Sequence, residues 1–373
     1  GVEIMKKCYF IFSLMLLMVA CTPTATPAPA PLAPNVPKVN LPSTVEDDVW
    51  INIVKAAKKE GMVNIYSFSW TGDTGLVMAK AFGDRYGVKL NIITGRGAEF
   101  LERVKTEARM GQVVADLWEG SLVHSENMKL TGLLTPAGGL PILQEKEKFT
   151  LDPRRNSPEG YYYIANQYYI ALHVNTNLVK RGEEPTAWVD LLSPKWKGNL
   201  IFTDPNLSDN TSYLAILIEQ KRLTLDFLEK LGKQDLKFDS SPSGLANRLA
   251  RGEAAIGYTG ASVTNSLARE GAPLKMIDTI EGVFGTGLAL GMVKKAPHPN
   301  ATRLLINWGL SQEGQDTYSK DRGLLSVRND VSDYQHPAIQ LKPQNPIFLT
   351  PEYNDLIAKV FREKQYVQWL KPK

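Results

Sequence analysis

The sequence predicts an α/β fold of two lobes, each a mostly parallel β-sheet flanked by helices, and three observations support this prediction. Strand-like runs such as residues 63–68 alternate with helix-like runs, as they do in βαβ units. The same alternation returns in the second half of the chain, beginning at residues 199–203. The chain has 373 residues, which favours more than one domain, and its 43% hydrophobic and 22% charged residues are ordinary for a globular protein.

The N-terminal residues have the composition of a secretion signal. Two lysines precede an apolar run at residues 9–20, which is too short for a comfortable membrane span and fits the core of a signal peptide. The run ends in Leu-Met-Val-Ala-Cys at residues 17–21, which resembles a bacterial lipoprotein box. The resemblance implies that residues 1–20 are a removed signal peptide and that Cys21 carries a lipid. The alternative is a simple secretory signal with an incidental cysteine.

Residues 21–42 contain the predicted lipid-acceptor cysteine and a proline-rich tether. Seven prolines lie between residues 23 and 42, separated mainly by small Ala and Thr. Because proline fixes φ and lacks an N–H donor, this segment should form an extended, semi-rigid spacer. We therefore expect an extracytoplasmic location, lipid-anchored to the cell membrane, in the periplasm or on the outer face of a bacterial envelope.

A helix is predicted to open the folded part. Residues 43–46 read Ser-Thr-Val-Glu, the pattern of a capping box, and Gly61 is placed to end the helix. Apolar side chains between these ends recur at helical spacing and should form one buried face: Val49, Trp50, Ile53, Val54 and Ala57.

Strands and helices then alternate in two blocks. The first block has predicted strands at residues 63–68, 88–93 and 114–118 and helices at 74–82 and 98–110. The second has strands at 199–203 and 255–258 and helices near 210–219 and 262–270. Because ligands bind beyond the carboxyl ends of strands in such sheets, the candidate ligand loops are residues 67–74, 94–98, 119–121, 203–211 and 258–262.

The sequence offers no recognisable catalytic or metal-binding constellation. The only cysteines are Cys8 and Cys21, so the folded part has no thiol for catalysis, for a disulfide or for metal binding. The four histidines lack the spacing of a zinc site: His124, His173, His298 and His336. No phosphate-binding glycine loop occurs, and a net charge of +4 gives no argument for a nucleic acid partner. We expect no enzyme activity, no metal and no cofactor.

Aromatic residues suggest two places for a ligand. Five tyrosines lie between residues 161 and 169, and they suit either the wall of a cleft or hinge, or a strand packed in the core. Trp70 follows the first strand of the block in a glycine-containing loop. There it would serve either as a ligand platform or as a packing residue.

Several segments resemble, in order, those of one protein family. They are residues 63–67, 95–99 with 115–117, 251–258, 296–301, 307–308, 311–315, 322–323 and 327–331. From these segments the chain resembles the substrate-binding protein of a bacterial ABC importer, in the iron(III)-type branch with the type II periplasmic-binding fold. The similarity covers roughly residues 45–335.

The resemblance implies a monomer that captures a small solute between two lobes and delivers it to an ABC permease in the membrane. Lobe one would comprise residues 43–165 and 284–322, and lobe two residues 167–283 and 324–373. The hinge crossings would fall near residues 165–168, 281–284 and 323–327. Hinge closure on the solute is the expected motion.

One departure from the family bears on the solute. Iron-binding members have a tyrosine pair shortly after the segment that corresponds to residues 251–258, whereas this chain has Thr-Gly-Ala-Ser-Val-Thr at 259–264. Since ferric ion needs anionic oxygen ligands, a small polar or anionic organic solute is expected instead. Ferric iron, or a secreted α/β enzyme, is the alternative.

The candidate ligand residues follow from the strand ends and from the family. Residues 203–211 would form an anion seat of hydroxyls and main-chain N–H groups at a helix start, which is where an anionic group docks in the family. Arg96 could bind a carboxylate or phosphonate, or instead pair with Glu99 at the surface. The full predicted set is Ser67, Phe68, Trp70, Thr71, Arg96, Ser121, Gln167, Tyr168, Thr203, Asp204, Ser208, Thr211, Tyr258, Ser262 and Glu281.

Overall fold

The computed structural model describes residues 45–207, 210–322, 324–331, 343, 345–363 and 370. The predicted signal peptide, Cys21, the tether, Ser43 and Ser208 therefore lie outside the described residues. The described residues belong to one compact unit. Within the described residues, no helix has the length and apolar character needed to cross a membrane.

The first block of predicted elements is present with small shifts of boundary. Gly61 adopts φ +73°, a left-handed conformation that glycine tolerates, and it ends the first helix as predicted. The elements are α1 (Val45–Glu60), β1 (Met62–Ser67), α2 (Gly72–Tyr86), β2 (Lys89–Thr94), α3 (Gly97–Met110), β3 (Leu117–Ser121) and α4 (Leu122–Leu130).

Two details of the first block differ from the prediction. The third strand begins at Leu117 rather than at residue 114, because Val114 is tied through its N–H to Glu107 at the end of the preceding helix. Val49 is 56% exposed and does not belong to the buried face of α1. The buried side chains of that helix are Ile53 and Ala57, so the apolar face is narrower than the sequence pattern suggested.

The middle of the chain contains a long strand and the second block. A 3₁₀ turn and a short α-helix replace the single helix predicted at 210–219, and the strand predicted at 255–258 extends to residue 260. The elements are η1 (Pro141–Gln144), η2 (Lys146–Lys148), β4 (Tyr162–Asn175), η3 (Trp188–Leu192), η4 (Pro194–Trp196), β5 (Leu200–Thr203), η5 (Asn210–Tyr213), α5 (Leu214–Glu219), α6 (Leu225–Gly232), β6 (Lys237–Asp239), α7 (Pro242–Ala250), β7 (Ile256–Gly260) and α8 (Ala261–Arg269).

The last third of the chain returns to the first block and then adds short strands. Its α9 packs against α1 and β1, far away in sequence. The elements are β8 (Leu274–Ile277), β9 (Val283–Met292), α9 (Pro299–Gly309), α10 (Gln312–Arg322), β10 (Leu325–Ser326), β11 (Pro346–Phe348) and α11 (Pro351–Glu363).

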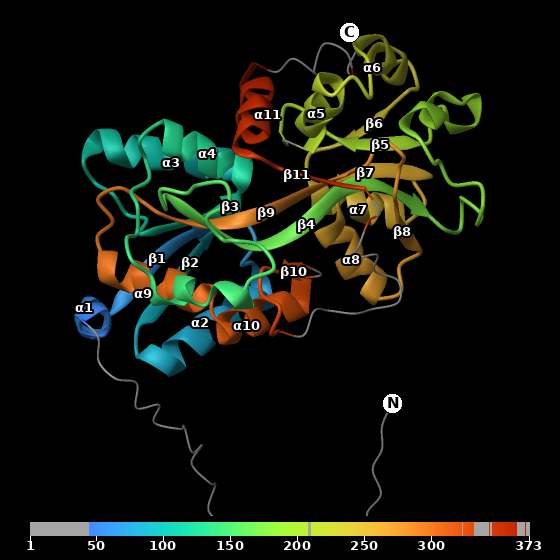
Figure 1. Ribbon diagram of the computed structural model, residues 1–373. Helices are drawn as coiled ribbons and strands as arrows, with labels where there is room; N and C mark the ends of the chain where they lie inside the picture. The colour runs from blue at the N-terminus through green and yellow to red at the C-terminus, as the bar shows by residue number, and fades with distance from the viewer. Residues whose placement is uncertain are drawn as a thin grey trace, which may run out of the picture. The chain divides into compact units, whose positions relative to one another are not determined.

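One mixed sheet joins the two blocks, where the sequence suggested two separate sheets. Its strand order is β2-β1-β3-β9-β4-β7-β5-β6, with β8 and β10 also paired to β4 and β11 paired to β9. The outer sets are parallel, as predicted, whereas β4 and β9 run antiparallel to each other. The strands β7, β8 and β10 are antiparallel to β4, and β3 is antiparallel to β9, whereas β11 runs parallel to β9. The α/β class is confirmed, and the two blocks share these long central strands (Figure 1).

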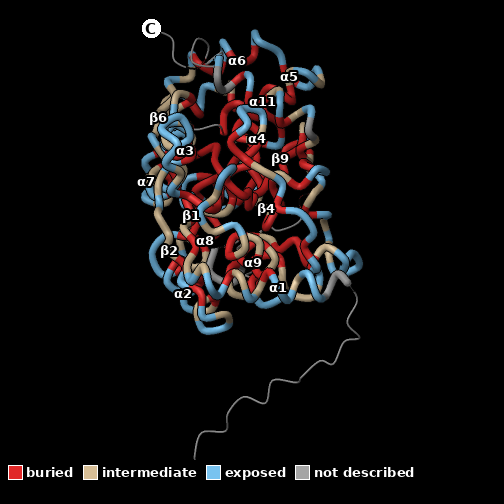
Figure 2. The backbone as a smooth tube through the Cα atoms, turned by 90° about the vertical axis from the view of Figure 1, so that its left-hand side faces the viewer, coloured by how far each residue is buried: buried red, intermediate tan, exposed pale blue. Residues whose placement is uncertain are grey.

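The core follows the central strands. All ten residues of β9 are buried, as are most of those in β4, and Figure 2 shows the buried stretches along both strands. Strands covered on both faces read as continuous apolar runs, which explains why no alternation marked them in the sequence. Polar side chains on these strands therefore need a hydrogen-bond partner inside the fold or in a bound ligand, and they are candidates for the functional site.

Candidate functional site

The carboxyl ends of two sets of parallel strands point toward the middle of β4 from opposite directions. On one side β3 ends at Ser121, which pairs with Leu288 of β9, and Leu288 pairs in turn with Asn166 of β4. On the other side β7 ends at Gly260, which pairs with Ile170 of β4. Asn166 and Ile170 are four residues apart, about 13 Å along a strand. Ligands bind beyond the carboxyl ends of strands, so the three residues between them form the centre of the candidate site.

Three chain segments cross this centre side by side. Asn166 and Gln167 of β4 pair with β9 along one edge and with β10 along the other. The register between β4 and β9 shifts next to Ala165. Residues 166–167 of β4 and 325–326 of β10, which belong to two of the predicted hinge crossings, pair with each other here. Residues 287–288 of β9 lie beside them. The lobe boundaries themselves stay a prediction.

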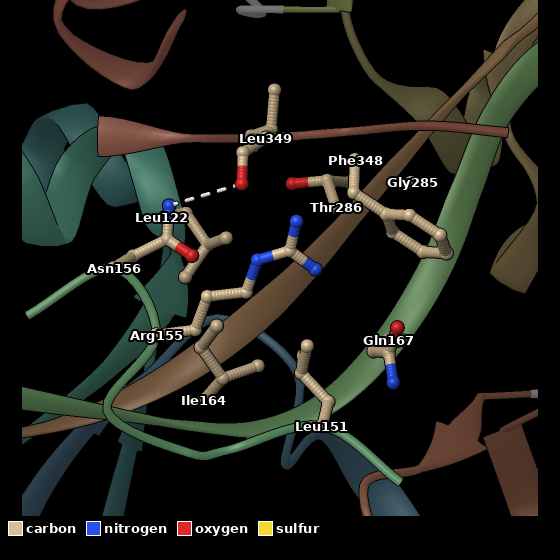
Figure 3. Close-up of a pocket in the computed structure, with 10 residues that line it drawn as sticks. All are labelled: Leu122, Leu151, Arg155, Asn156, Ile164, Gln167, Gly285, Thr286, Phe348 and Leu349. Atoms are coloured by element: carbon tan, nitrogen blue, oxygen red, sulfur yellow. Dashed lines mark hydrogen bonds between the residues drawn. The ribbon is translucent and has the colours of Figure 1, made fainter. Parts of the chain in front are cut away.

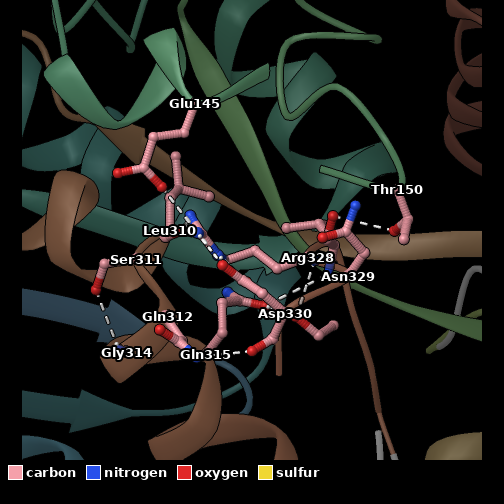
Figure 4. A network of polar contacts seen from close by, with 12 residues as sticks. Glu145, Thr150, Leu310, Ser311, Gln312, Gly314, Gln315, Arg328, Asn329 and Asp330 are labelled. Carbon is pink, nitrogen blue, oxygen red and sulfur yellow. Dashed lines mark hydrogen bonds and ion pairs between the residues drawn. The ribbon is translucent and has the colours of Figure 1, made fainter. Parts of the chain in front are cut away.

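Buried polar contacts hold the crossing segments to α10. Gln315 donates through Nε2 to the carbonyl oxygen of Ala165, and the hydroxyl of Ser326 in β10 donates to Gln315 Oε1. The donor–acceptor distance is 2.7 Å in both hydrogen bonds. Arg328, which follows β10 and is 3% exposed, pairs with Asp330 and with Glu145 over 2.7 and 2.8 Å (Figure 4). These contacts tie segments far apart in sequence to one point of the sheet.

A buried carboxylate lies at the ends of β1 and β3. Glu119 is 1% exposed, and its oxygens accept hydrogen bonds from Ser67 Oγ at 2.6 Å, Ser69 Oγ at 2.7 Å and Ser69 N at 2.9 Å. Ser69 Oγ also lies 2.5 Å from Tyr318 Oη of α10. The hydroxyl of Ser67 is therefore used within the fold, whereas the sequence suggested that it would bind ligand.

Buried hydroxyls collect at the ends of β5 and β7. Phe202 pairs with Tyr258, so Thr203 and Thr259 come next on adjacent strands. Thr203, Thr259 and Thr211 of η5 are all fully buried, and no hydrogen-bond partner for their Oγ1 atoms exists among the described residues. Since η5 contacts β5 and β7, the three hydroxyls belong to one region. Buried polar atoms are nearly always paired, which marks this region as a place for a polar ligand.

The central strands add polar groups between these two ends. Tyr168 of β4 is half-buried and pairs with Thr286 of β9. Thr286 Oγ1 lies 2.9 Å from Tyr213 Oη of η5. The Tyr168 ring lies so close to Gly260 that a Cβ there would sit 3.2 Å from Cε2. Asn166 is buried, and neither side-chain polar atom has a hydrogen-bond partner among the described residues.

A narrow crevice opens beside the crossing, and Arg155 extends into it (Figure 3). Its walls include Gln167, Thr286 and Phe348, and its volume is about 10 Å³, room for about one water molecule. The guanidinium of Arg155 lies 5.4 Å from the centre of the Phe348 ring. No ion pair involves Arg155 among the described residues. No pattern in the sequence marks this arginine as a ligand residue.

Several predicted ligand side chains are buried or have hydrogen-bond partners within the fold. Trp70 is 2% exposed and packs edge-on against Tyr318, which favours the packing alternative. Tyr258 is fully buried against Trp188 at 5.0 Å between ring centres. Glu281 accepts a hydrogen bond from the main-chain N–H of Trp188, and the hydroxyl of Ser121 lies 2.8 Å from Nδ1 of His124 at the start of α4.

Other predicted residues lie at the surface or at turns. Arg96 is exposed and pairs with Glu99 at 3.5 Å, which is the surface alternative. Phe68 and Thr71 are exposed beside the end of β1, and the carboxylate of Asp204 accepts a hydrogen bond from Asn206 N within the turn after β5. Ser262 is half-buried in the first turn of α8, close to Gly260.

The tyrosine cluster belongs mainly to the core. Tyr162, Tyr163 and Tyr169 are buried in β4, and only Tyr161 and Tyr168 are half-buried. Burial raises the pKa of Tyr163 to about 12 and also raises the pKa of Tyr169. Phenolates at these positions are therefore disfavoured at neutral pH.

Glu119 and Thr259 lie in candidate ligand loops and Asn166 lies in a predicted hinge crossing, but none of the three was in the predicted ligand set. Arg155 lies outside all of these segments. A charged residue inside an otherwise apolar strand could have marked Glu119, since buried carboxylates need partners. No such signal marks Arg155, because an exposed arginine in a loop is common.

Comparisons with known proteins agree on one family. The family model described as bacterial extracellular solute-binding protein matches residues 77–347. An uncharacterized protein of Haemophilus influenzae is 30% identical over 272 residues, which is 69% of this chain and 75% of that protein. A putative 2-aminoethylphosphonate-binding periplasmic protein of Salmonella typhi is 22% identical over 318 residues, 81% of this chain and 90% of that protein.

Solved structures share the fold at low identity. The periplasmic binding protein AfuA from Actinobacillus pleuropneumoniae, with fructose-6-phosphate bound, matches with a TM-score of 0.69 and 21% identity, over 84% of this chain and 99% of that one. Iron-bound HitA from Pseudomonas aeruginosa matches with a TM-score of 0.68 and 20% identity, over 81% of this chain and 98% of that one. These matches confirm the type II periplasmic-binding fold, and they leave the solute open.

Proposed function

The chain belongs to the bacterial extracellular solute-binding proteins, and we propose that it binds a small organic anion at the centre of β4 for delivery to an ABC permease. The function of solute capture follows from the family. The identity of the solute class is our own inference from the site.

One observation carries this proposal: the strand ends of both blocks converge on Gln167–Tyr169, and three buried threonine hydroxyls at the second block's strand ends have no hydrogen-bond partner among the described residues. Thr203, Thr211 and Thr259 supply donors for an oxyanion. Arg155 extends into the crevice at the same crossing and supplies a positive charge with a planar fork of donors. Phosphonate, phosphate and carboxylate groups all fit hydroxyls and a guanidinium.

Two of the matched proteins are consistent with this class of solute. One is described as binding 2-aminoethylphosphonate and one has fructose-6-phosphate bound. A ferric solute is the alternative, because HitA has iron bound. The region after β7 lacks the tyrosine pair of iron-binding members, and three tyrosines of β4 lie in the core, which argues for the organic anion.

The same proposal covers the N-terminal segment, the oligomeric state and the absence of catalysis. We infer that residues 1–20 are a signal peptide and that Cys21 carries a lipid anchor, so the binding domain stands off the membrane on its proline-rich tether. We also infer a monomer that closes on its solute and has no catalytic activity. No group of three or more His, Cys, Asp or Glu within the described residues could hold a metal ion.

Native mass spectrometry of freshly purified protein tests the solute class directly. A co-purified organic anion is expected. Thermal unfolding in the presence of phosphonates, sugar phosphates, organic acids, polyamines and ferric citrate provides the second measurement. A solute at one hundred times its Kd should stabilise the fold by about 2.7 kcal/mol. Stabilisation by ferric citrate alone, lost when the iron is chelated, would overturn the proposal.

A further inference from the structure

A second pocket lies at the opposite end of β3 from the crossing segments. It opens between the last turns of α3 and α4 and the loop that follows β9, and its volume is about 520 Å³. Pockets of about 300–1,000 Å³ are typical of small-molecule sites. This volume is far larger than the 10 Å³ of the crevice at the crossing.

Four cationic side chains line this pocket, and no carboxylate is among its lining residues. They are Lys105 and Arg109 of α3 and Lys294 and Lys295 after β9. Within the described residues, only Lys105 has an ion pair, with Glu102 at 2.7 Å. The Arg109 guanidinium donates only to Thr106 Oγ1, at 3.1 Å.

The negative carboxyl ends of two helices offset only part of this positive charge. Gly111 and Thr131, the residues that cap the carboxyl ends of α3 and α4, line the pocket. Each helix end carries about half a negative charge, so the two offset about one lysine. Glu102 offsets Lys105. About two positive charges remain without compensation, which favours a multiply charged anion.

The lysine pair is held in place by the backbone. Lys294 donates through its main-chain N–H to the carbonyl oxygen of Leu133 at 2.8 Å, and Val293 forms a bridge with Leu134. Lys295 adopts φ +63°, a left-handed conformation that a residue with a side chain rarely adopts. The fold thus fixes two adjacent lysines at the rim of a pocket that also has apolar walls from Val113, Leu133 and Val293.

We propose that this pocket binds a multiply charged phosphate-type anion, at a site separate from the solute site at the centre of β4. The ligand contacts Arg109, Lys294 and Lys295 through phosphate oxygens. The site does not depend on the identity of the transported solute.

Calorimetric titration of the full chain with inorganic tripolyphosphate at low ionic strength tests the proposal. The double substitution Lys294→Gln with Lys295→Gln should weaken binding about tenfold. The matched control is Lys58→Gln with Lys59→Gln, an exposed lysine pair at the end of α1 that carries the same charge change. The control should bind as the unchanged protein does. Thr211→Val, in the solute site, separates the two sites: the tripolyphosphate binding that depends on Lys294 and Lys295 should remain in this variant.

Two results would overturn the proposal that this pocket binds an anion. One is the absence of tripolyphosphate binding to the unchanged protein together with no binding of anionic vesicles. The other is an equal loss of affinity in both lysine double variants, which would mean that the anion responds to overall charge rather than to this site.

A vesicle experiment distinguishes a soluble phosphate from a lipid headgroup. Sedimentation with vesicles of phosphatidylglycerol in phosphatidylcholine uses the Cys21→Ser background, which removes the predicted lipid. Vesicle binding that requires Lys294 and Lys295 assigns the anion to a lipid headgroup. Tripolyphosphate binding with the same requirement, without vesicle binding, assigns it to a soluble phosphate.

Discussion

Gln315 of α10 donates through its side-chain Nε2 to the main-chain carbonyl oxygen of Ala165, 2.7 Å away, at the point where the register between β4 and β9 shifts. The same amide donates to Gly309 O and accepts from Ser326 Oγ. One buried side chain thereby joins the two crossing segments β4 and β10 to the end of α9.

We expect Gln315→Leu to lower the free energy of unfolding by about 3 kcal/mol, because it leaves the buried Ser326 O–H without its acceptor and removes the Nε2 donor from two carbonyl oxygens. Urea unfolding monitored by fluorescence measures this. Gln312→Ala, in the exposed first turn of the same helix, serves as the control and should change stability by about 0.5 kcal/mol or less. Equal stability of the Leu variant and the unchanged protein would contradict the role of Gln315.

Thr211→Val should weaken solute binding about tenfold while leaving the fold as stable as before. The substitution keeps the shape of the side chain and removes a buried hydroxyl that has no partner among the described residues, so folding loses no hydrogen bond. Thr302→Val is the matched comparison, because its buried hydroxyl donates to His298 O at 2.8 Å. There we expect lower stability by about 1 kcal/mol and unchanged affinity. Calorimetry and urea unfolding on both variants separate a binding hydroxyl from a structural one.

Substitutions of Arg155 and Arg96 should differ in their effect on solute affinity. Arg155→Gln removes the cation of the crevice and should reduce affinity for an anionic solute about tenfold, with a weaker dependence on salt. Arg96→Gln removes only an exposed ion pair with Glu99 and should leave affinity unchanged. Titration of both variants at two salt concentrations makes the comparison. A larger effect at Arg96 would restore the sequence-based assignment.

His173 should make the protein less stable in mild acid. Burial lowers the pKa of this histidine to about 4 from its ordinary 6.5, so the folded state resists protonation. Below pH 6.5 the unfolded chain takes up a proton that the folded chain refuses, and stability falls as pH drops from about 6.5 to 4. The loss should reach about 3 kcal/mol.

His173→Gln removes this titration. Urea unfolding at pH 7 and pH 4.5 should therefore give a smaller difference in the variant than in the unchanged protein. The same pH dependence in both proteins would show that other groups govern the loss of stability.

Cys21→Ser should release the protein from the membrane fraction of cells that express the full chain. The predicted lipid is attached to the Cys21 thiol, and serine provides no thiol for that attachment. Fractionation followed by immunodetection measures the change, and Cys8→Ser is the control, because Cys8 lies in the predicted signal peptide. Membrane retention of the Cys21 variant would favour a simple secretory signal.

Several features of the fold could be predicted from local sequence. The helix ending at Gly61, the βαβ alternation and the strand ends at residues 67 and 203 follow from short-range signals, and the structure reproduces them within a few residues. For β4 the tyrosines at residues 161–169 suggested a core strand only as one of two interpretations. The strand had no clearer signal, because a strand buried on both faces has no alternation of polar and apolar residues.

The candidate site was less predictable because residues of the same type have different roles in the fold. The hydroxyl of Ser67 bonds to Glu119, fifty-two residues away in sequence, whereas that of Thr211 has no partner among the described residues. Trp70 lies in a loop but packs under Tyr318. Nothing near these residues in sequence distinguishes the two outcomes.

The sequence by itself determined the class of fold, the family resemblance and the predicted export signal with its tether. These depend on spacing, turn residues and short motifs, which lie within a few neighbouring positions. Only the tertiary structure decided that both sets of strand ends converge on the middle of β4, that Arg155 rather than Arg96 extends into the crevice, and which hydroxyls are already used. Burial and hydrogen-bond partners are set by contacts between residues distant in sequence, and for this reason the site became visible only in the fold.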